Sequence, residues 1–248
     1  STSRRQRQMC IRDRNFLQLL QQLDRQEEIA RFRISSIEPN LLTDEIIEFV
    51  ATSKRFMPHF HIPLQSGSDK VLRLMNRRYD TALFRSRIEL IKELIPDAFI
   101  GVDIIAGARG ETPEEWEKSL AFADSLPVSR YHIFPYSERP GTKALQLDTV
   151  VSQQEKHRRV TLLQEVSDHK MRDFQTSFIG TRRPVLWEAG NGTDLMSGHT
   201  DNYIRVEAPF REDLINKVEV ATLLGITPHD PESMKGSFRA EPINDILS

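Results

Sequence analysis

The sequence contains little cysteine and no long apolar run. One cysteine, Cys10, occurs among 248 residues, so no internal disulfide can form, which favours a reducing compartment. No stretch reaches the roughly 18 apolar residues of a membrane span, and the first residues lack the apolar core of a secretory signal. A single thiol also cannot hold an iron–sulfur cluster, so cluster ligands would have to come from elsewhere. We therefore expect a cytoplasmic protein that does not enter membranes.

The charge of the chain depends on its first residues. Residues 1–14 carry five arginines and one aspartate with no apolar period, and the formal net charge of −2 becomes −6 without them. This tract is either a disordered basic arm or non-native, adapter-derived sequence, and we exclude it from the fold. If it is non-native, the natural protein begins upstream and its N-terminal part is missing. Global charge does not indicate nucleic-acid binding.

Apolar runs that end in turns of Gly, Ser and Pro alternate with helical patterns in the first part of the chain. Strands separated by single helices pair in parallel through right-handed crossovers, and active sites form at their carboxyl edge. Four strands are too few to close a barrel, so this α/β domain is open, completed by missing N-terminal strands, or both. The predicted strands are 31–38, 58–64, 98–107 and 130–135, and the predicted helices are 15–30, one beginning after Thr43, one after Ser68, one ending at Leu94, and one beginning after Thr112.

The pattern changes after Gly180. A helix is predicted over 152–178, and short strand patterns follow in PVLWEA, YIRVEAP, KVEVATLLGI and GSFRAE, with a hairpin turn at Asn191-Gly192. These features predict a small all-β barrel. We divide the chain into a tract over 1–14, a β/α domain over 15–150, a helical connector over 151–180 and the β domain over 181–248.

Polar residues at the end of the second predicted strand are candidates for binding. Gln65 is followed by Ser66, Gly67 and Ser68, whose N–H groups and hydroxyls could hold an anionic or ribose-like ligand, or could serve only as a turn and a helix N-cap. Alternation places His59 and His61 together on one strand face. With no third ligand nearby in the sequence, we do not predict a metal site there.

A carboxylate interrupts the next apolar strand. Asp103 requires a partner, because an unpaired buried carboxylate costs several kcal/mol, and the candidates are Arg33 or a ligand hydroxyl. Gly101, Gly107 and Gly110 permit either close backbone approach or an ordinary turn.

Three arginines and one glutamate lie near these strand ends. Arg77 or Arg78 could reach a carboxylate over the strand edge or lie at the surface. Arg139 precedes Pro140 and is held extended. Glu111 could stabilise the dipole of the helix that follows and do nothing more.

The motifs SSIEPN, HIPLQSGSD, LMNRRY, GVDIIAGARGET and PYSERPGT occur in this order, followed by GHTDNY in the β region. Over residues 31–225 this arrangement resembles the radical S-adenosylmethionine methylthiotransferases. SSIEPN and PYSERPGT are most similar to the subfamily that acts on N6-threonylcarbamoyladenosine in tRNA. The isopentenyladenosine and ribosomal-protein subfamilies usually differ at these two motifs.

The resemblance implies the C-terminal part of an open (β/α)6 radical SAM barrel followed by a TRAM-like barrel. It implies S-adenosyl-L-methionine and two 4Fe–4S clusters in the intact protein, one held by a CxxxCxxC loop, and a flavodoxin or ferredoxin as electron donor. It further implies transfer of a methylthio group to C2 of the modified adenosine at position 37 of tRNA. The cluster cysteines are absent from this sequence, so this chain alone is predicted to be inactive.

Residue roles follow from the matching motifs. Gln65 and Ser66 would line the ribose or methionine end of S-adenosylmethionine, Arg77 its carboxylate, and Asp103 to Gly107 the wall near adenine. The sequence ARGET departs here from the family's usual FPGET. Residues 184–248 hold five basic and eleven acidic side chains. Either RNA contacts come from Arg182, Arg183 and Arg205, or the β domain mainly supports the β/α domain.

Three other interpretations remain open. The chain could belong to a methylthiotransferase for isopentenyladenosine tRNA or a ribosomal protein, to a catalytically silent RNA-binding or scaffold protein, or to an unrelated phosphate-binding barrel enzyme. An open partial barrel exposes apolar edges, so we also predict poor solubility for this chain expressed alone.

Overall fold

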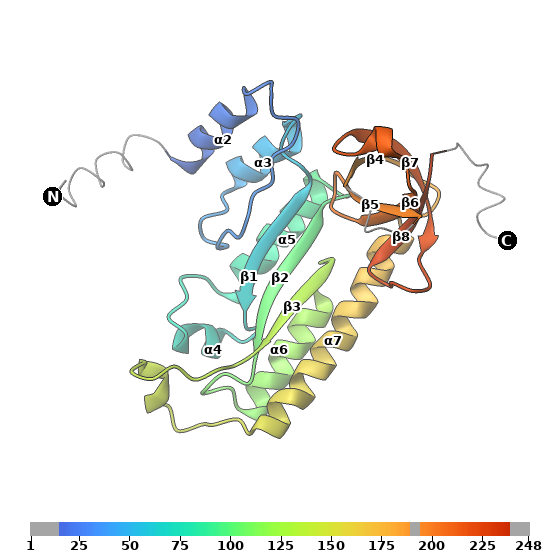
Figure 1. Ribbon diagram of the computed structural model, residues 1–248. Coiled ribbons are helices and arrows are strands. Elements are labelled where there is room, and N and C mark those ends of the chain that lie inside the picture. The colour runs from blue at the N-terminus through green and yellow to red at the C-terminus, as the bar shows by residue number, and fades with distance from the viewer. Residues whose placement is uncertain (1–14, 189–193, 239–248) are drawn as a thin grey trace.

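Three parallel strands form the central sheet of the computed structural model, which describes residues 15–188 and 194–238 (Figure 1). The sheet order is β1-β2-β3, and each connection between consecutive strands is helical. The sequence therefore predicted these three strands and their parallel pairing correctly. Their bounds are β1, His59–Gln65; β2, Phe99–Ala106; and β3, Arg130–Pro135.

Side-chain caps define where the helices of this half begin. Ser68 caps α4, Asp80 caps α5 and Thr112 caps α6, each by accepting a backbone N–H in the first turn. Thr43 makes no side-chain cap, contrary to prediction. The helices are α2, Phe16–Asp24; α3, Asp44–Thr52; α4, Asp69–Leu74; α5, Thr81–Leu94; α6, Pro113–Ser125; and α7, Gln153–Thr176.

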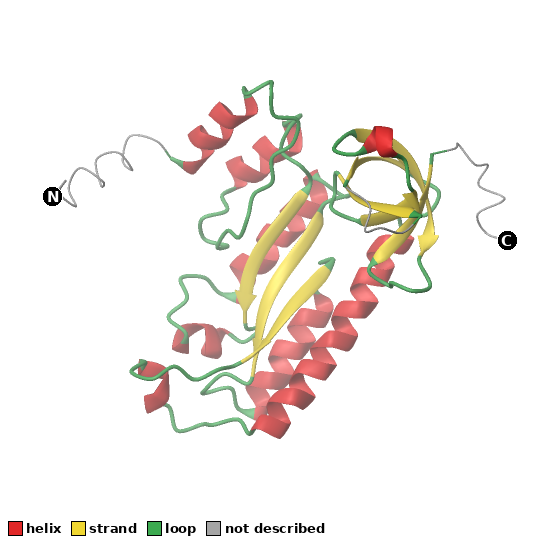
Figure 2. Cartoon of the chain, viewed as in Figure 1, coloured by secondary structure: helices red, strands yellow, loops and turns green. Residues whose placement is uncertain are grey.

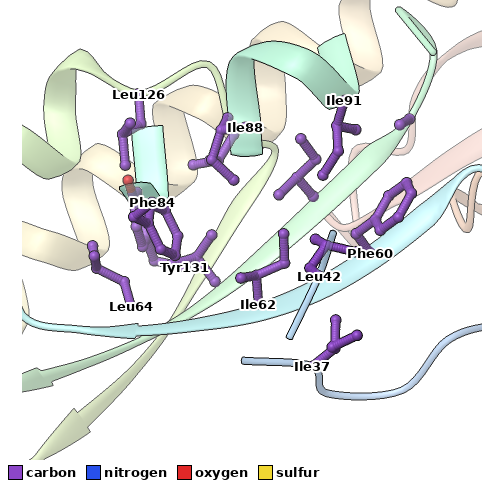
Figure 3. Packing of buried hydrophobic residues seen from close by; sticks show 14 of the residues in the cluster. Ile37, Leu42, Phe60, Ile62, Leu64, Phe84, Ile88, Ile91, Leu126 and Tyr131 are labelled. Carbon is purple, nitrogen blue, oxygen red and sulfur yellow. The ribbon is translucent and has the colours of Figure 1, made fainter. Parts of the chain in front are cut away.

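One face of the sheet carries the main hydrophobic core. The alternating apolar side chains of β1 point toward α5 (Figure 3). Together these fully buried side chains form a continuous apolar layer between sheet and helix. They are Phe60, Ile62 and Leu64 from β1 and Phe84, Ile88 and Ile91 from α5. The opposite face, which carries His59 and His61, is left for polar side chains.

The strand predicted over 31–38 does not form. Only two isolated bridges occur there, Phe32 with Phe56 and Ser36 with His61. The backbone N–H of Ile37 donates to the His61 carbonyl at 3.1 Å, but the segment between the bridges runs as irregular chain. The helix predicted over 15–30 likewise ends at Asp24, because no apolar residue between 25 and 28 continues its buried stripe.

The second half of the described chain is a closed barrel of five strands in the order β4-β5-β6-β8-β7 (Figure 2). Val185, Trp187 and Met234 are fully buried in its own core. Its strands are β4, Arg182–Trp187; β5, Leu195–Thr200; β6, Arg205–Pro209; β7, Val218–Ile226; and β8, Ser233–Ser237. Short 3-10 turns, η1 (Lys143–Gln146) and η2 (Glu212–Leu214), lie in the connections.

The small barrel was predicted, but two of its strands were not placed correctly. β5 was missed because Ser, Gly, His and Thr in LMSGHT give no apolar alternation. β8 lies at Ser233–Ser237, earlier than the predicted GSFRAE strand, whose end is outside the described residues. The tract over 1–14 and the turn at Asn191-Gly192 also lie outside them.

The barrel sits at the end of the sheet where β1, β2 and β3 begin, and α7 leads into it along the sheet (Figure 1). Phe99 at the start of β2 packs against Phe174 near the end of α7. Both residues belong to the hydrophobic core of the barrel, which extends to the start of the sheet. Within the described ranges, no helix has both the length and the apolar content needed to cross a membrane.

Candidate functional site

The turn after β1 is docked against α6 through its own polar groups. The Gly67 N–H donates to the Ser119 hydroxyl at 2.8 Å, and the Ser68 N–H donates to the Ser66 hydroxyl at 3.2 Å. The Ser68 hydroxyl in turn donates to the Glu115 carboxylate. A Cβ on Gly67 would lie 2.7 Å from the Ser119 carbonyl oxygen, so only glycine allows this approach. The backbone donors proposed for an anion are therefore already engaged.

Gln65 is the residue of this turn that stays partly accessible. Its backbone has φ +68°, and the pairing register with β2 slips between Pro63 and Gln65. A positive φ is costly for a residue with a side chain and is held only where the surroundings enforce it. Ser66 is fully buried beneath it. Of the two residues predicted to bind a ligand, Ser66 therefore has a structural role, and the Gln65 amide lies at the carboxyl edge.

The turn after β2 is held by a buried ion pair. The Arg159 guanidinium donates to the Glu111 carboxylate at 2.7 Å, and their side chains are 4% and 0% exposed. The Gly107 N–H donates to the same carboxylate oxygen at 2.7 Å. Burial raises the pKa of Glu111, while Arg159 and the Gly107 N–H oppose that shift. Glu111 therefore fixes the turn, in addition to lying near the start of α6.

Gly107 itself is required by this turn. It adopts φ +79°, and an added Cβ would lie 2.4 Å from Cγ of Lys156. The Lys156 ammonium donates to the Tyr136 carbonyl at 3.0 Å, which ties the chain after β3 to α7. Three strand ends are thus held at one edge by contacts to α6 and α7.

One of the two candidate arginines at this edge reaches a carboxylate of the chain itself. Arg77 donates to the Glu38 carboxylate at 3.0 Å, bringing LMNRRY and SSIEPN together. The Tyr79 hydroxyl donates to the Pro63 carbonyl at 2.8 Å, and burial raises the pKa of Tyr79 to about 12. Arg78 and Arg139 are exposed.

Asp103 has a partner that the sequence did not predict. The His61 Nε2 lies 2.6 Å from the Asp103 Oδ1, on the face of the sheet away from the main core. Arg33, which we had considered as its partner, lies over the Tyr203 ring instead. Because β1 and β2 pair in parallel with Pro63 opposite Asp103, His61 is one diagonal step away. Alternation of β1 combined with that register would have identified the pair.

The arginines predicted to contact RNA differ in what they touch. Arg183 donates to Asp201 at 2.8 Å and to Asp97 at 2.7 Å, joining the barrel to the loop before β2. Arg205 pairs with Asp230 at 3.1 Å. Arg182 is exposed on β4.

Comparison with known proteins points to one superfamily. Residues 11–123 match the family model for the radical SAM superfamily. The threonylcarbamoyladenosine tRNA methylthiotransferase MtaB of Bacillus subtilis is 35% identical over 219 residues, which cover 86% of this chain and 49% of that protein. The chain thus carries a radical SAM domain match and is similar to tRNA methylthiotransferases over most of its own length.

Two further proteins are similar to this chain. The tRNA-2-methylthio-N(6)-dimethylallyladenosine synthase of Endomicrobium trichonymphae is 33% identical over 206 residues, covering 83% of this chain and 49% of that protein. The solved structure of Escherichia coli coproporphyrinogen III oxidase, a radical SAM enzyme, aligns with a TM-score of 0.47 and 16% identity over 69% of this chain and 46% of that one. The chain spans about half the length of the curated methylthiotransferases it matches.

The radical SAM family implies an iron–sulfur cluster, and this chain does not supply its ligands. Such clusters are held by several Cys thiolates, whereas Cys10 is the one cysteine in the sequence. Across residues 15–188 and 194–238, no group of three or more His, Cys, Asp or Glu side chains is arranged to hold a metal ion. Any cluster therefore needs ligands from other polypeptide.

Proposed function

We propose that this chain is the part of a tRNA methylthiotransferase that carries the second half of its radical SAM barrel, and that the enzyme adds a methylthio group to C2 of N6-threonylcarbamoyladenosine at position 37. The observation that carries this proposal is 35% identity to MtaB over 86% of the chain. The motifs SSIEPN and PYSERPGT favour this substrate over dimethylallyladenosine, also called isopentenyladenosine. A tRNA substrate would place the reaction in the cytoplasm.

The dimethylallyladenosine synthases are the main alternative, because their identity to this chain is only slightly lower. The two substrates differ in the N6 group, which is charged and polar in one case and apolar in the other. Recognition of either must come from side chains near the modified base, and many of those lie outside the matched half. The nucleoside product is therefore the decisive measurement.

S-adenosylmethionine would bind at the carboxyl edge, contacting Gln65, Arg77 and the strand segment from Asp103 to Gly107, while the buried Ser66 would hold the turn in place. The partly accessible amide of Gln65 and the buried Nε of Arg77, which has no hydrogen-bond partner in the described structure, support this. Bound S-adenosylmethionine and a reduced cluster supply the radical chemistry, while the protein supplies placement. We propose that the intact enzyme holds two 4Fe–4S clusters and takes electrons from a flavodoxin or ferredoxin.

The five-stranded barrel would act as a TRAM-like RNA-binding module. Of the three arginines considered for RNA, Arg182 offers the most accessible charge, while Arg183 and Arg205 are paired with carboxylates. Phosphate contacts give affinity without sequence specificity. Arg182→Gln should therefore weaken tRNA binding equally for modified and unmodified substrates.

The proposal is tested by expressing the full-length gene in Bacillus subtilis lacking MtaB and measuring tRNA nucleosides by mass spectrometry. Restored 2-methylthio-N6-threonylcarbamoyladenosine is the expected result. Appearance of the dimethylallyl product alone would assign the alternative substrate. Detection of neither product would favour a catalytically silent RNA-binding protein. The 248-residue chain, which lacks the cluster cysteines, should not restore either product and serves as the negative control.

A further inference from the structure

A cavity of about 470 Å³ lies where the small barrel meets the sheet. Its walls include His59 and Phe99, the first residues of β1 and β2, and Tyr203 from the barrel. This is the end of the strands opposite the carboxyl edge that holds Gln65 and Gly107 (Figure 1). The cavity lies toward the opposite end from Gln65 and Gly107, although its lining reaches His61, the partner of Asp103. An inference about this cavity does not rest on the S-adenosylmethionine proposal.

Of the three arginines that line this cavity, Arg33, Arg130 and Arg205, only Arg33 has no oxygen partner within the described residues. Arg31 donates to the Pro184 carbonyl at 3.0 Å, Arg130 pairs with Glu232, and Arg205 pairs with Asp230. Arg33 differs, because its guanidinium carbon lies 3.7 Å from the centre of the Tyr203 ring. That stacking fixes the plane of the guanidinium and leaves its N–H groups available. An oriented cation at the wall of a cavity favours an anionic ligand.

Beside Arg33, the cavity wall is aromatic at His59 and Phe99, and the other charged lining residues, Arg130, Arg205 and Glu232, are engaged in ion pairs. The His59 ring stacks on Phe99 with centroids 5.3 Å apart and an interplanar angle of 6°. Burial, with Arg33 and His61 adding to it, lowers the pKa of His59 to about 3, so the ring is uncharged at neutral pH. The buried His59 Nδ1 has no hydrogen-bond partner in the part of the chain that the structure describes. Flat rings of this kind bind heteroaromatic bases by stacking.

We propose that this cavity binds a nucleotide, with its phosphate on Arg33 and its base against the aromatic wall near His59. The volume lies within the range of small-molecule sites and exceeds what a bare phosphate fills. An uncharged nucleoside would leave Arg33 without a partner, and a simple carboxylate would leave the aromatic wall unused. A free nucleotide and one nucleotide of an RNA strand share this chemistry.

Isothermal titration calorimetry on the 248-residue chain tests the proposal with four probes: AMP, adenosine, inorganic phosphate and a single-stranded RNA tetranucleotide. AMP should bind, and adenosine and phosphate should each bind at least about tenfold more weakly. Arg33→Gln should weaken AMP binding by a similar factor. Arg25→Gln, which removes an exposed arginine just after α2, should leave AMP affinity unchanged. Thermal melting should show that both variants remain folded.

A second variant keeps the test independent of Arg33. His59→Phe retains an aromatic ring and removes Nδ1, so AMP affinity should fall severalfold. Binding of the tetranucleotide but not AMP, with the same dependence on Arg33, would support the site and identify RNA as its source. Absence of binding by both, or AMP binding that Arg33→Gln leaves intact, would overturn the proposal. Displacement of AMP by S-adenosylmethionine would also overturn it, because the two sites would then be one.

Discussion

The rings of His61 and His132 stack with centroids 5.1 Å apart, although their strands do not pair with each other. β2 lies between β1 and β3, and Gly101 of β2 is the cross-strand partner of His61 and lies against the His132 ring. A Cβ on Gly101 would lie 3.4 Å from the His132 Nε2 and 3.3 Å from the Phe99 ring. The absence of a side chain in the middle strand is therefore what allows the outer strands to touch on this face.

Gly101→Val should force these rings apart. Overpacking of this kind costs about 1–3 kcal/mol, which corresponds to a fall in Tm of roughly 2–12 °C. Gly225→Val is the matched control, since a Cβ there meets nothing within 4 Å. Differential scanning calorimetry on both variants checks the prediction. Equal falls in Tm would show that replacing any strand glycine has this cost, independently of the stacked rings.

Arg159→Met should destabilise the chain strongly. It leaves the fully buried Glu111 carboxylate without its cation, and breaking one partner of a buried pair costs about 3–5 kcal/mol. Arg158→Met removes a neighbouring arginine that pairs with Glu155 at the surface and should cost less than about 1 kcal/mol. Urea denaturation measures both free energies of unfolding. Similar values for the two variants would mean that solvent reaches Glu111.

Stability should fall as the pH drops below about 6.5, in part because of His59. Its pKa is lowered from 6.5 to about 3 in the folded chain, so the unfolded state binds the proton more readily across this window. The contribution is fully present above pH 6.5 and is lost progressively toward pH 3. His59→Phe should lose less stability than the parent between pH 7 and pH 4.5, as measured by urea unfolding. His157→Gln, at an exposed position of α7, should follow the parent.

Arg183→Gln should loosen the contact between barrel and sheet. The guanidinium bridges Asp201 of the barrel and Asp97 before β2, and a neutral amide replaces neither ion pair fully. We expect faster hydrogen exchange for the backbone around 97–99 and 200–203 while the centre of β2 stays protected. Arg182→Gln, one residue earlier and exposed, should leave exchange unchanged. Unaltered exchange in Arg183→Gln with a loss of tRNA affinity would instead assign Arg183 to RNA.

Helices and strands whose apolar residues recur with a regular period were predicted correctly from the sequence. β1 alternates buried and polar side chains, α5 repeats its apolar residues at helical spacing, and β4 with β7 supply enough apolar positions to predict a barrel. β5 was missed because its inward positions include Gly198 and Thr200, which carry little apolar signal. The strand predicted over 31–38 reduces to bridges, since apolar content alone cannot show how many hydrogen bonds a neighbouring strand provides.

Long-range pairings were harder to predict than elements. Asp103 was recognised as needing a partner, and Arg33 was a chemically reasonable candidate, but strand register decides which group lies within reach. His61 lies diagonal to Asp103 across paired strands, and Arg33 is drawn to Tyr203 from the distant barrel. The turn after β1 looked suited to an anion, yet Ser119 of α6 occupies its Gly67 donor. These outcomes depend on tertiary contacts that no local spacing encodes.

The barrel lies at the amino ends of the strands. A substrate that contacts both the barrel and the carboxyl edge of the sheet must therefore have a minimum length. β2 is eight residues long, so the two ends of the sheet are separated by roughly 25 Å. A molecule that touches both Arg182 and the edge near Gln65 must therefore extend well beyond the size of a single nucleoside. Under the proposed function, a tRNA would meet this requirement with its backbone on Arg182 and its modified base at the edge, whereas a free modified adenosine would be held at one end only.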